Sequence, residues 1–362
     1  MSVGVIFGGD STEHEISCIS AYGVISNIDR EKYNVYKIGI LKDGKWFVYD
    51  GPESSISNMA WETDSDNLIP AVISPCSAHH GVLMLNKRES RYEIKRLDCV
   101  FPVLHGKNGE DGTMQGLLKI AGIPFVGCGT LSSAISMDKA VTKVIADSHG
   151  IKQTPWLHTV CSDTEDMDAV IDKACAALKF PIFVKPANAG SSVGISRALS
   201  RGEVYEAVRK ASAVDGKIIF EQGVKGRELE VAVFEDRGEN GEKILVASKC
   251  GEIIPENGFY DYDAKYVSDT KLAVPAQVSD ELNEKIGDIA KKIFRMLGCR
   301  SLSRVDFFLD ESGELIFNEI NTMPGFTGIS MYPKLMEVSG VSYPDLIDRL
   351  ITNAVRFPDQ GE

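Results

Sequence analysis

The sequence predicts a mixed fold, α/β at its N-terminal end and α+β afterwards, built from three units. Over roughly the first third of the chain, strand-like runs alternate with helix-like runs, beginning with the apolar run 3–7. This alternation is typical of a parallel sheet covered on its faces by helices. From about Val224 onward, alternating strands precede a long helix and a hairpin. A length of 362 residues also exceeds what one small domain usually holds.

The first unit is expected at residues 1–137. After the strand at 3–7, a helix is expected to begin near Glu13, with Ser11 or Thr12 as its cap. Residues 45–95 are irregular and rich in Ser and Asn, so they are interpreted as an elaboration of this unit. Further strands are expected at 33–41 and 98–104, and a further helix at 113–121.

The second unit is expected at 138–224 and the third at 225–362. The second would contain helices near 138–149, 164–178 and 203–213, with strands at 181–185 and 217–221. The third would contain a helix near 280–297, a hairpin at 303–321 and a last helix near 343–355.

Composition excludes several classes of protein. A net charge of −13 argues against nucleic acid as a partner, because such proteins need a basic face. No apolar run approaches the length of a membrane span, and the N-terminus lacks the pattern of a signal peptide. Eight cysteines without a C-x-x-C pair predict reduced thiols, and six dispersed histidines give no support for zinc. We therefore expect no membrane partner and a cytoplasmic location.

The hairpin near the C-terminal end carries the strongest local signal. A turn centred on Ser312-Gly313 would join two strand-like runs and fix their register. This register would place six side chains on one face, paired as Asp306 with Glu319, Arg304 with Asn321 and Phe308 with Phe317. A shift of one residue would remove this arrangement.

Two carboxylates directly opposite each other repel, unless a cation lies between them. Asp306, Glu319 and Asn321 offer only oxygen ligands, which suit a Mg²⁺ ion that also carries phosphate oxygens. The alternative is an ordinary solvated hairpin face, and the two phenylalanines assigned to this face disfavour it.

A second pattern indicates a nucleotide. The run 181–186 is a buried strand in which Lys185 shares a face with Phe183, and a loop of small residues follows at 187–194. Backbone N–H groups in such a loop can approach phosphates closely. The lysine precedes the loop, so this is not a Walker A sequence, and a flexible linker remains the alternative.

Another strand, 218–221, ends in an acid. Glu221 and, seven residues later, Glu228 could serve an adenine and a ribose. Two surface acids beside Lys225 and Arg227 are the simpler interpretation of this segment alone.

Together these segments resemble the D-alanine–D-alanine ligase family of the ATP-grasp fold, over nearly the whole chain. The matching motifs are G-G-D-S-T-E-H-E-I-S (8–17), V-L-H-G-K-N-G-E-D-G-T-M-Q-G (103–116), M-D-K (137–139), V-K-P-A-N-A-G-S-S-V-G (184–194), F-Y-D-Y-D-A-K-Y (259–266), S-R-V-D-F (303–307) and N-E-I-N-T-M-P-G-F-T (318–327). Seven motifs in order make the resemblance specific.

The resemblance implies ATP as the nucleotide, with Mg²⁺ or Mn²⁺ as two ions per site. Lys139, Lys185 and Lys265 would hold the phosphates, while Asp306, Glu319 and Asn321 match the family's metal ligands. The other residues of the nucleotide site would be Glu221 and Val224 at the adenine, Glu228 at the ribose, and Phe183 and Phe308.

The resemblance also implies two amino-acid subsites. Glu13 would pair with the ammonium of the first D-alanine, with His105 nearby, and Ser191 would link Glu13 to Tyr266 in a lid at about 251–270. Arg304 and Ser330 would bind the carboxylate of the second substrate. Arg304 and the backbone N–H near Gly325 would stabilise the oxyanion.

The implied activity is ligation of two D-alanines through an acyl phosphate, for peptidoglycan precursor synthesis, by a homodimer. A D-alanine–D-serine ligase of the vancomycin-resistance type is the alternative; Met331 supplies an apolar wall that favours D-alanine, and Tyr266 counts against D-lactate. A different amino-acid substrate and a catalytically inactive nucleotide-binding regulator are further alternatives. The phosphate lysines and metal ligands are all present, which disfavours the regulator.

Overall fold

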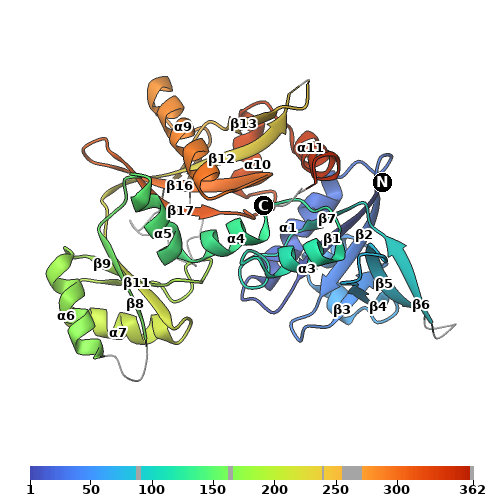
Figure 1. Cartoon of the computed structure of the whole chain (residues 1–362), viewed down its shortest axis with the longest axis horizontal. Helices are drawn as coiled ribbons and strands as arrows, with labels where there is room; N and C mark the ends of the chain where they lie inside the picture. The colour runs from blue at the N-terminus through green and yellow to red at the C-terminus, as the bar shows by residue number, and fades with distance from the viewer. Residues whose placement is uncertain (87–90, 162–165, 239, 255–270, 359–362) are drawn as a thin grey trace.

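The computed structural model describes residues 1–86, 91–161, 166–238, 240–254 and 271–358. Within these ranges the strands form three sheets, which lie along the length of the molecule in Figure 1. None of the helices in the described ranges is long and apolar enough to cross a membrane.

The N-terminal sheet has the strand order β6-β5-β4-β3-β2-β1-β7. Its strands are β1 (Ser2–Gly8), β2 (Asn34–Ile40), β3 (Trp46–Tyr49), β4 (Leu68–Ile73), β5 (Gly81–Asn86), β6 (Arg91–Arg96) and β7 (Cys99–Pro102). Its helical segments are α1 (His14–Asn27), α2 (Ser54–Ser57), the 3₁₀ turn Ala60–Thr63 and α3 (Thr113–Ala121). The helix predicted at 113–121 is thus confirmed to the residue.

The expectation of a parallel first sheet is only partly correct. β1 runs parallel to β2 and β7, but the strands from β2 through β6 pair antiparallel. The segment 45–95, interpreted as an irregular elaboration, instead supplies β3 to β6 at the sheet edge. Short connections between consecutive strands allow antiparallel pairing, whereas parallel neighbours need a crossover such as α1.

The four-stranded sheet has the order β10-β9-β11-β8, and all its pairs are antiparallel. Its strands are β8 (Trp156–Val160), β9 (Ile182–Pro186), β10 (Ser196–Ala198) and β11 (Lys217–Gln222). The helices α6 (Met167–Ala177) and α7 (Arg201–Ser212) pack on one face, where Ile182 and Val184 are buried. Alternation along β9 therefore directs Phe183 and Lys185 to the other face.

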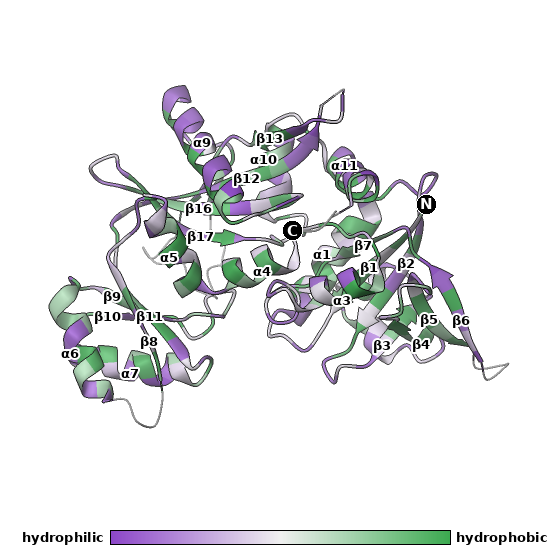
Figure 2. Ribbon diagram, viewed as in Figure 1, coloured by the Kyte–Doolittle hydropathy of each residue, from purple (hydrophilic) through white to green (hydrophobic). Residues whose placement is uncertain are grey.

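The six-stranded sheet has the order β15-β14-β12-β16-β17, with β13 paired to β12. Its strands are β12 (Gly226–Arg237), β13 (Lys243–Ala247), β14 (Gly251–Ile254), β15 (Lys271–Ala273), β16 (Leu302–Asp310) and β17 (Leu315–Asn321). The helix α9 (Asp280–Met296) covers its apolar face, and both hydrophilic and hydrophobic stretches are visible on the helix in Figure 2. The opposite face is free to carry polar groups.

Three further helices connect the sheets. α10 (Met331–Val338) and α11 (Tyr343–Arg356) share one hydrophobic core with α1 and the N-terminal sheet. α5 (Lys139–Ser148) leads from the N-terminal part into the four-stranded sheet. α4 (Thr130–Met137) was not expected, because its Ser- and Thr-rich sequence has a low intrinsic helix propensity. These helices hold the three sheets around a common cavity.

Candidate active site

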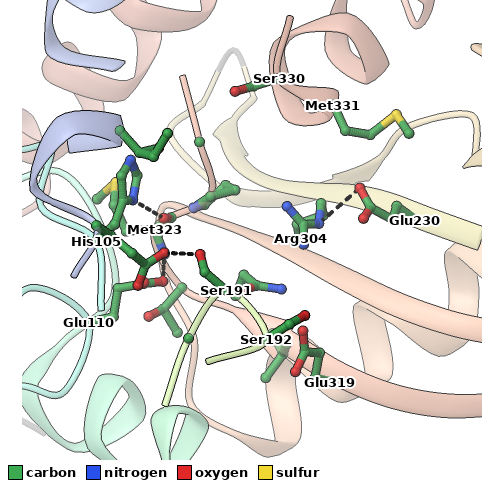
Figure 3. A pocket seen from close by; sticks show the side chains of 18 of the residues that line it. His105, Glu110, Ser191, Ser192, Glu230, Arg304, Glu319, Met323, Ser330 and Met331 are labelled. Atoms are coloured by element: carbon green, nitrogen blue, oxygen red, sulfur yellow. Dashed lines mark hydrogen bonds and ion pairs between the residues drawn. The ribbon is translucent and has the colours of Figure 1, made fainter. Parts of the chain in front are cut away.

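A cavity of about 650 Å³ lies where residues from all three sheet regions converge. Figure 3 shows that its wall combines side chains from distant parts of the chain. The wall residues used below are Glu13, His105, Glu110, Lys139, Ser191, Glu230, Arg304, Glu319, Asn321, Gly325, Ser330 and Met331.

The polar face of the six-stranded sheet carries a row of three carboxylates. Glu230 on β12 pairs with Asp306 on β16, and Asp306 pairs with Glu319 on β17. Asp306 and Glu230 are both buried. Because directly paired residues share one face of a sheet, this register brings three negative charges together. Such an arrangement needs cations to offset the repulsion.

The predicted hairpin register is confirmed at the site and wrong beyond it. Arg304 pairs with Asn321 and Asp306 with Glu319, but a register shift then pairs Phe307, not Phe308, with Phe317. Phe307 and Phe317 are buried in the apolar core, with their ring centroids 6.2 Å apart. A bulge at this point reverses the facing of one strand relative to the other. Phe317 therefore does not share the polar face with Phe308.

Arg304 supplies one of the offsetting charges. Its guanidinium donates to both carboxylate oxygens of Asp306, at 2.8 and 2.7 Å, and its Nε lies 3.0 Å from a Glu230 oxygen. Asn321 Nδ2 also donates to Asp306, at 3.0 Å. Arg304 and Asp306 were assigned to different ligands from the sequence, yet here they contact each other. Each must therefore exchange this contact when its own ligand binds.

The two phosphate lysines described here lie at the same junction. Lys139, the first residue of α5, donates to the Ala189 carbonyl at 2.7 Å and lies 3.7 Å from a Glu319 oxygen. Lys185 forms an ion pair with Glu221, whose other oxygen lies 2.6 Å from Lys143 Nζ. Burial would raise the pKa of Glu221, but Lys143 and Lys185 outweigh it and lower this pKa to about 2. The carboxylate stays ionised between two lysines.

The remaining residues predicted for the nucleotide are close in register. Phe183 pairs with Glu221 across β9 and β11, and Glu228 pairs with Phe308 across β12 and β16. These four side chains, with Val224 and Lys185, lie outside the lining of the 650 Å³ cavity, as far as the described residues define it. The structure thus places them beside the cavity and not in its wall.

The first turn of α1 leaves Glu13 free for the cavity. Glu13 is the N-cap residue, but its side chain makes no capping bond, so the expectation of a Ser11 or Thr12 cap is wrong. Ser11 Oγ instead accepts from the Glu13 N–H at 3.1 Å and donates to the His105 carbonyl at 2.9 Å. Ser191 Oγ donates a short hydrogen bond to the buried Glu13 carboxylate.

Ser191 lies in the loop at 187–194 and adopts a left-handed backbone conformation, with φ of 48°. A Cβ atom on its neighbour Gly190 would come within 2.6 Å of a Glu13 oxygen. Only glycine therefore allows this loop to approach Glu13 so closely.

His105 is buried against the same wall. Its ring nitrogens lie 3.1 Å from the Met323 carbonyl and 3.0 Å from Ser20 Oγ. Burial lowers the pKa of His105, although the Glu13 carboxylate opposes this shift. A neutral imidazole is the form that this environment favours.

Glu110 lines the cavity but was not assigned from the sequence. Its two oxygens accept from the backbone N–H groups of Gly106, at 2.8 Å, and Met323, at 3.3 Å. Burial, with a contribution from the Glu13 charge, raises the pKa of Glu110 to about 8. The only sequence signal was its position within the motif at 103–116. Glu230 was missed as well, because its role depends on pairing across β12 and β16.

The end of the cavity next to α10 is formed by Ser330, Gly325 and Met331. Ser330 Oγ accepts from the Thr327 N–H at 3.0 Å. A Cβ atom on Gly325 would come within 2.7 Å of Ser330 Oγ, so a side chain at this position would displace the hydroxyl. Met331 is buried beside Gly251 and provides an apolar surface.

Two predicted residues and one type of site complete the account. Lys265 and Tyr266, with most of the predicted lid at 251–270, lie outside the described residues. Among the residues that are described, no cluster of three or more His, Cys, Asp and Glu side chains has the arrangement of a metal site. The predicted ligand set has two carboxylates and one amide, so phosphate oxygens and water would have to complete it.

Comparison with known proteins agrees with this arrangement. Residues 2–128 match the profile described as D-ala D-ala ligase N-terminus, and residues 145–352 match that of the C-terminus. A D-alanine--D-alanine ligase of Acetivibrio thermocellus is 47% identical over 366 residues, covering 97% of this chain and 95% of its own.

Two solved structures are similar over almost the whole chain. The VanG D-Ala:D-Ser ligase from Enterococcus faecalis has a TM-score of 0.87 at 39% identity, covering 98% of this chain and 99% of its own. The D-alanine-D-alanine ligase from Coxiella burnetii has a TM-score of 0.85 at 32% identity, covering 98% and 94%. With both halves of the chain matched and a full-length relative at this identity, the chain belongs to the D-alanine–D-alanine ligase family, whose members have the ATP-grasp fold.

Proposed function

We propose that this protein uses ATP to join two D-alanine molecules into D-alanyl-D-alanine, a peptidoglycan precursor. The observation that carries the proposal is the single cavity in which the Glu13–Ser191 pair, Arg304 and the acid row meet. A reaction between two amino acids and a nucleotide needs such separate polar subsites around one centre.

Magnesium fits the residues at the acid row. Glu230, Asp306 and Glu319 bring three carboxylates together, while Arg304 supplies one positive charge among them. Asp306, Glu319 and Asn321 would hold Mg²⁺, or Mn²⁺, as two ions with phosphate oxygens in their shells. Bound there, the metal would supply charge neutralisation at the phosphates. In its absence, Arg304 and Lys139 offset part of the negative charge.

Lys139 and Lys185 would bind the ATP phosphates. Lys185 lies on the open face of the four-stranded sheet, and Lys139 begins the adjoining helix. Glu221, Val224 and Glu228 would border the adenosine, with Phe183 and Phe308 beside them. Lys265 would join the phosphate ligands from the lid. Lysine is suited to this task as a compact positive charge.

Glu13 would bind the ammonium of the first D-alanine, oriented by the Ser191 hydroxyl and by the lid residue Tyr266. His105, kept neutral by burial, would contact the substrate without adding a positive charge beside the ammonium. The carboxylate of this substrate would then face the nucleotide. It would attack the γ-phosphorus, so that an O–P bond forms as the bond to ADP breaks.

Arg304 and Ser330 would bind the carboxylate of the second D-alanine, and the N–H near Gly325 would share the developing oxyanion with Arg304. The second amine, after losing a proton, would attack the acyl carbon; a C–N bond forms and phosphate leaves. The acyl phosphate must be protected from water, and closure of the lid would provide this protection.

D-Serine is the second candidate for the second subsite, favoured by the structural similarity to the VanG D-Ala:D-Ser ligase. Met331 favours D-alanine, because an apolar wall complements a methyl group better than a hydroxymethyl group. We also propose three functional units at 1–137, 138–224 and 225–362, a homodimer, and a cytoplasmic location.

The test is to incubate the protein with Mg-ATP and D-alanine, with or without an equal concentration of D-serine, and to identify the products by mass. The expected product is D-alanyl-D-alanine, with L-alanine as an inactive control. Predominant D-alanyl-D-serine in the mixture would favour the second candidate. Phosphate release without any dipeptide would contradict ligation.

A further inference from the structure

A buried chain of charges leads from the inside of α5 to the nucleotide side of the cavity. Lys143 Nζ lies 2.6 Å from Glu221 Oε1, and the other oxygen of Glu221 contacts Lys185. The exposed fraction of the side chain is 2% for Lys143, 6% for Glu221 and 12% for Lys185. The chain therefore begins in the protein interior and reaches solvent at Lys185.

The helix explains why these groups meet. Lys139 and Lys143 are four residues apart on α5, so they project from the same side of the helix. Lys139 reaches Glu319 at the cavity, while Lys143 reaches Glu221 one turn further in. One helix thus contributes a cation to the site and a second cation behind it.

We propose that Lys143 is a positioning residue whose charge keeps Glu221 shared between two lysines, so that Lys185 retains positive charge for the nucleotide phosphates. The three groups carry a net charge of +1 with Lys143 present and zero without it. Without Lys143, both oxygens of Glu221 would be available to Lys185 and would neutralise it. A buried carboxylate held by a single lysine is a strong competitor of phosphate, because both seek the same cation.

Its surroundings leave Lys143 few other tasks. Lys143 Nζ makes a long, 3.5 Å contact to Gln153 Oε1 and lies 6.0 Å from the Trp156 ring centroid. It does not line the cavity, so it cannot itself contact the substrates. Burying an ammonium group costs free energy, and the printed contacts offer Glu221 as its one charged partner among the described residues.

The inference rests on the proposed role of Lys185 at the phosphates. It is tested by measuring the dissociation constants of ATP, ADP and adenosine by calorimetry for the wild type and Lys143→Met. We expect ATP and ADP to bind roughly tenfold more weakly to the variant, or worse, while adenosine changes by less than about twofold. The KM for D-alanine should stay near the wild-type value.

Two further variants separate charge from packing. Lys143→Arg should restore most of the ATP affinity, because it restores the buried charge. Adding Glu221→Gln to Lys143→Met should also improve ATP binding over the single variant, since the neutral amide no longer neutralises Lys185. Lys152→Met, which removes an exposed lysine paired with Glu314, is the matched control and should behave as the wild type.

The outcomes distinguish this inference from the proposed function. Equal weakening of ATP and adenosine, or an additive further loss in the double variant, would show that Lys143 only supports packing and would overturn the inference. Unchanged ATP affinity in Lys143→Met would overturn it as well. A wild-type protein that fails to bind ATP would instead contradict the proposed function.

Discussion

Glu110 should make the stability of the protein depend on pH. Burial, together with the Glu13 charge, raises its pKa from 4.5 to about 8. The unfolded chain therefore releases this proton from about pH 5 upward, while the folded protein keeps it until about pH 8. Because the folded state binds more protons within this window, its stability falls as the pH rises through it, and levels off above the folded pKa.

The size of the effect follows from the width of the window. Each unit of pH within it corresponds to about 1.36 kcal/mol, so the wild type should lose on the order of 3 kcal/mol between about pH 6 and pH 9 through this group. Glu110→Gln removes the titration. The amide has one acceptor oxygen where the carboxyl had two, so one of the bonds from Gly106 and Met323 is lost, at a cost of about 1 kcal/mol at every pH.

The assay is urea unfolding followed by tryptophan fluorescence across this pH range. The difference in unfolding free energy between the wild type and Glu110→Gln should favour the wild type at low pH and the variant at high pH. Glu15→Gln, which changes an exposed glutamate on α1, should leave the wild-type dependence intact. Parallel curves for the wild type and Glu110→Gln would refute the assignment of a titrating carboxyl at this position.

Other variants test the acid row, the bulge and the loop. Glu319→Gln should abolish turnover at physiological magnesium and recover part of it as magnesium is raised; near-normal turnover at low magnesium would contradict its role. Phe317→Ala should cost about 3–5 kcal/mol in unfolding free energy and Phe308→Ala clearly less, because only Phe317 lies in the core; equal losses would contradict the observed register. Ser191→Ala should raise the KM for the first D-alanine, measured by initial rates, by loosening Glu13; an unchanged KM would count against this contact.

Much of the fold could be predicted from periodicity. The helix at 113–121 and the strands of the hairpin follow from local patterns, which are set by residues close in sequence. The strand pairing within 45–95 could not, because it depends on contacts between segments with weak individual signals. The bulge near Phe307 was also invisible: an extra residue in one strand leaves the alternating pattern on each side intact.

The site was predictable to the extent that its chemistry lies in local motifs. The pairing of Asp306 with Glu319 followed from the turn, and the contact of Ser191 with Glu13 was implied by the family resemblance. Glu110 and Lys143 were not singled out, since each matters through burial and a distant partner. A single sequence does not show which charged residues are buried together.

The central claim is that the first D-alanine is activated at its carboxylate by transfer of the ATP γ-phosphate. It is tested most directly with D-alanine labelled with ¹⁸O in both carboxylate oxygens, followed by mass analysis of the released phosphate. One ¹⁸O atom should pass into phosphate for each dipeptide formed, because the bond between the acyl carbon and the transferred oxygen breaks in the second step. Dipeptide formation with unlabelled phosphate would contradict the acyl phosphate and the arrangement of groups proposed around it.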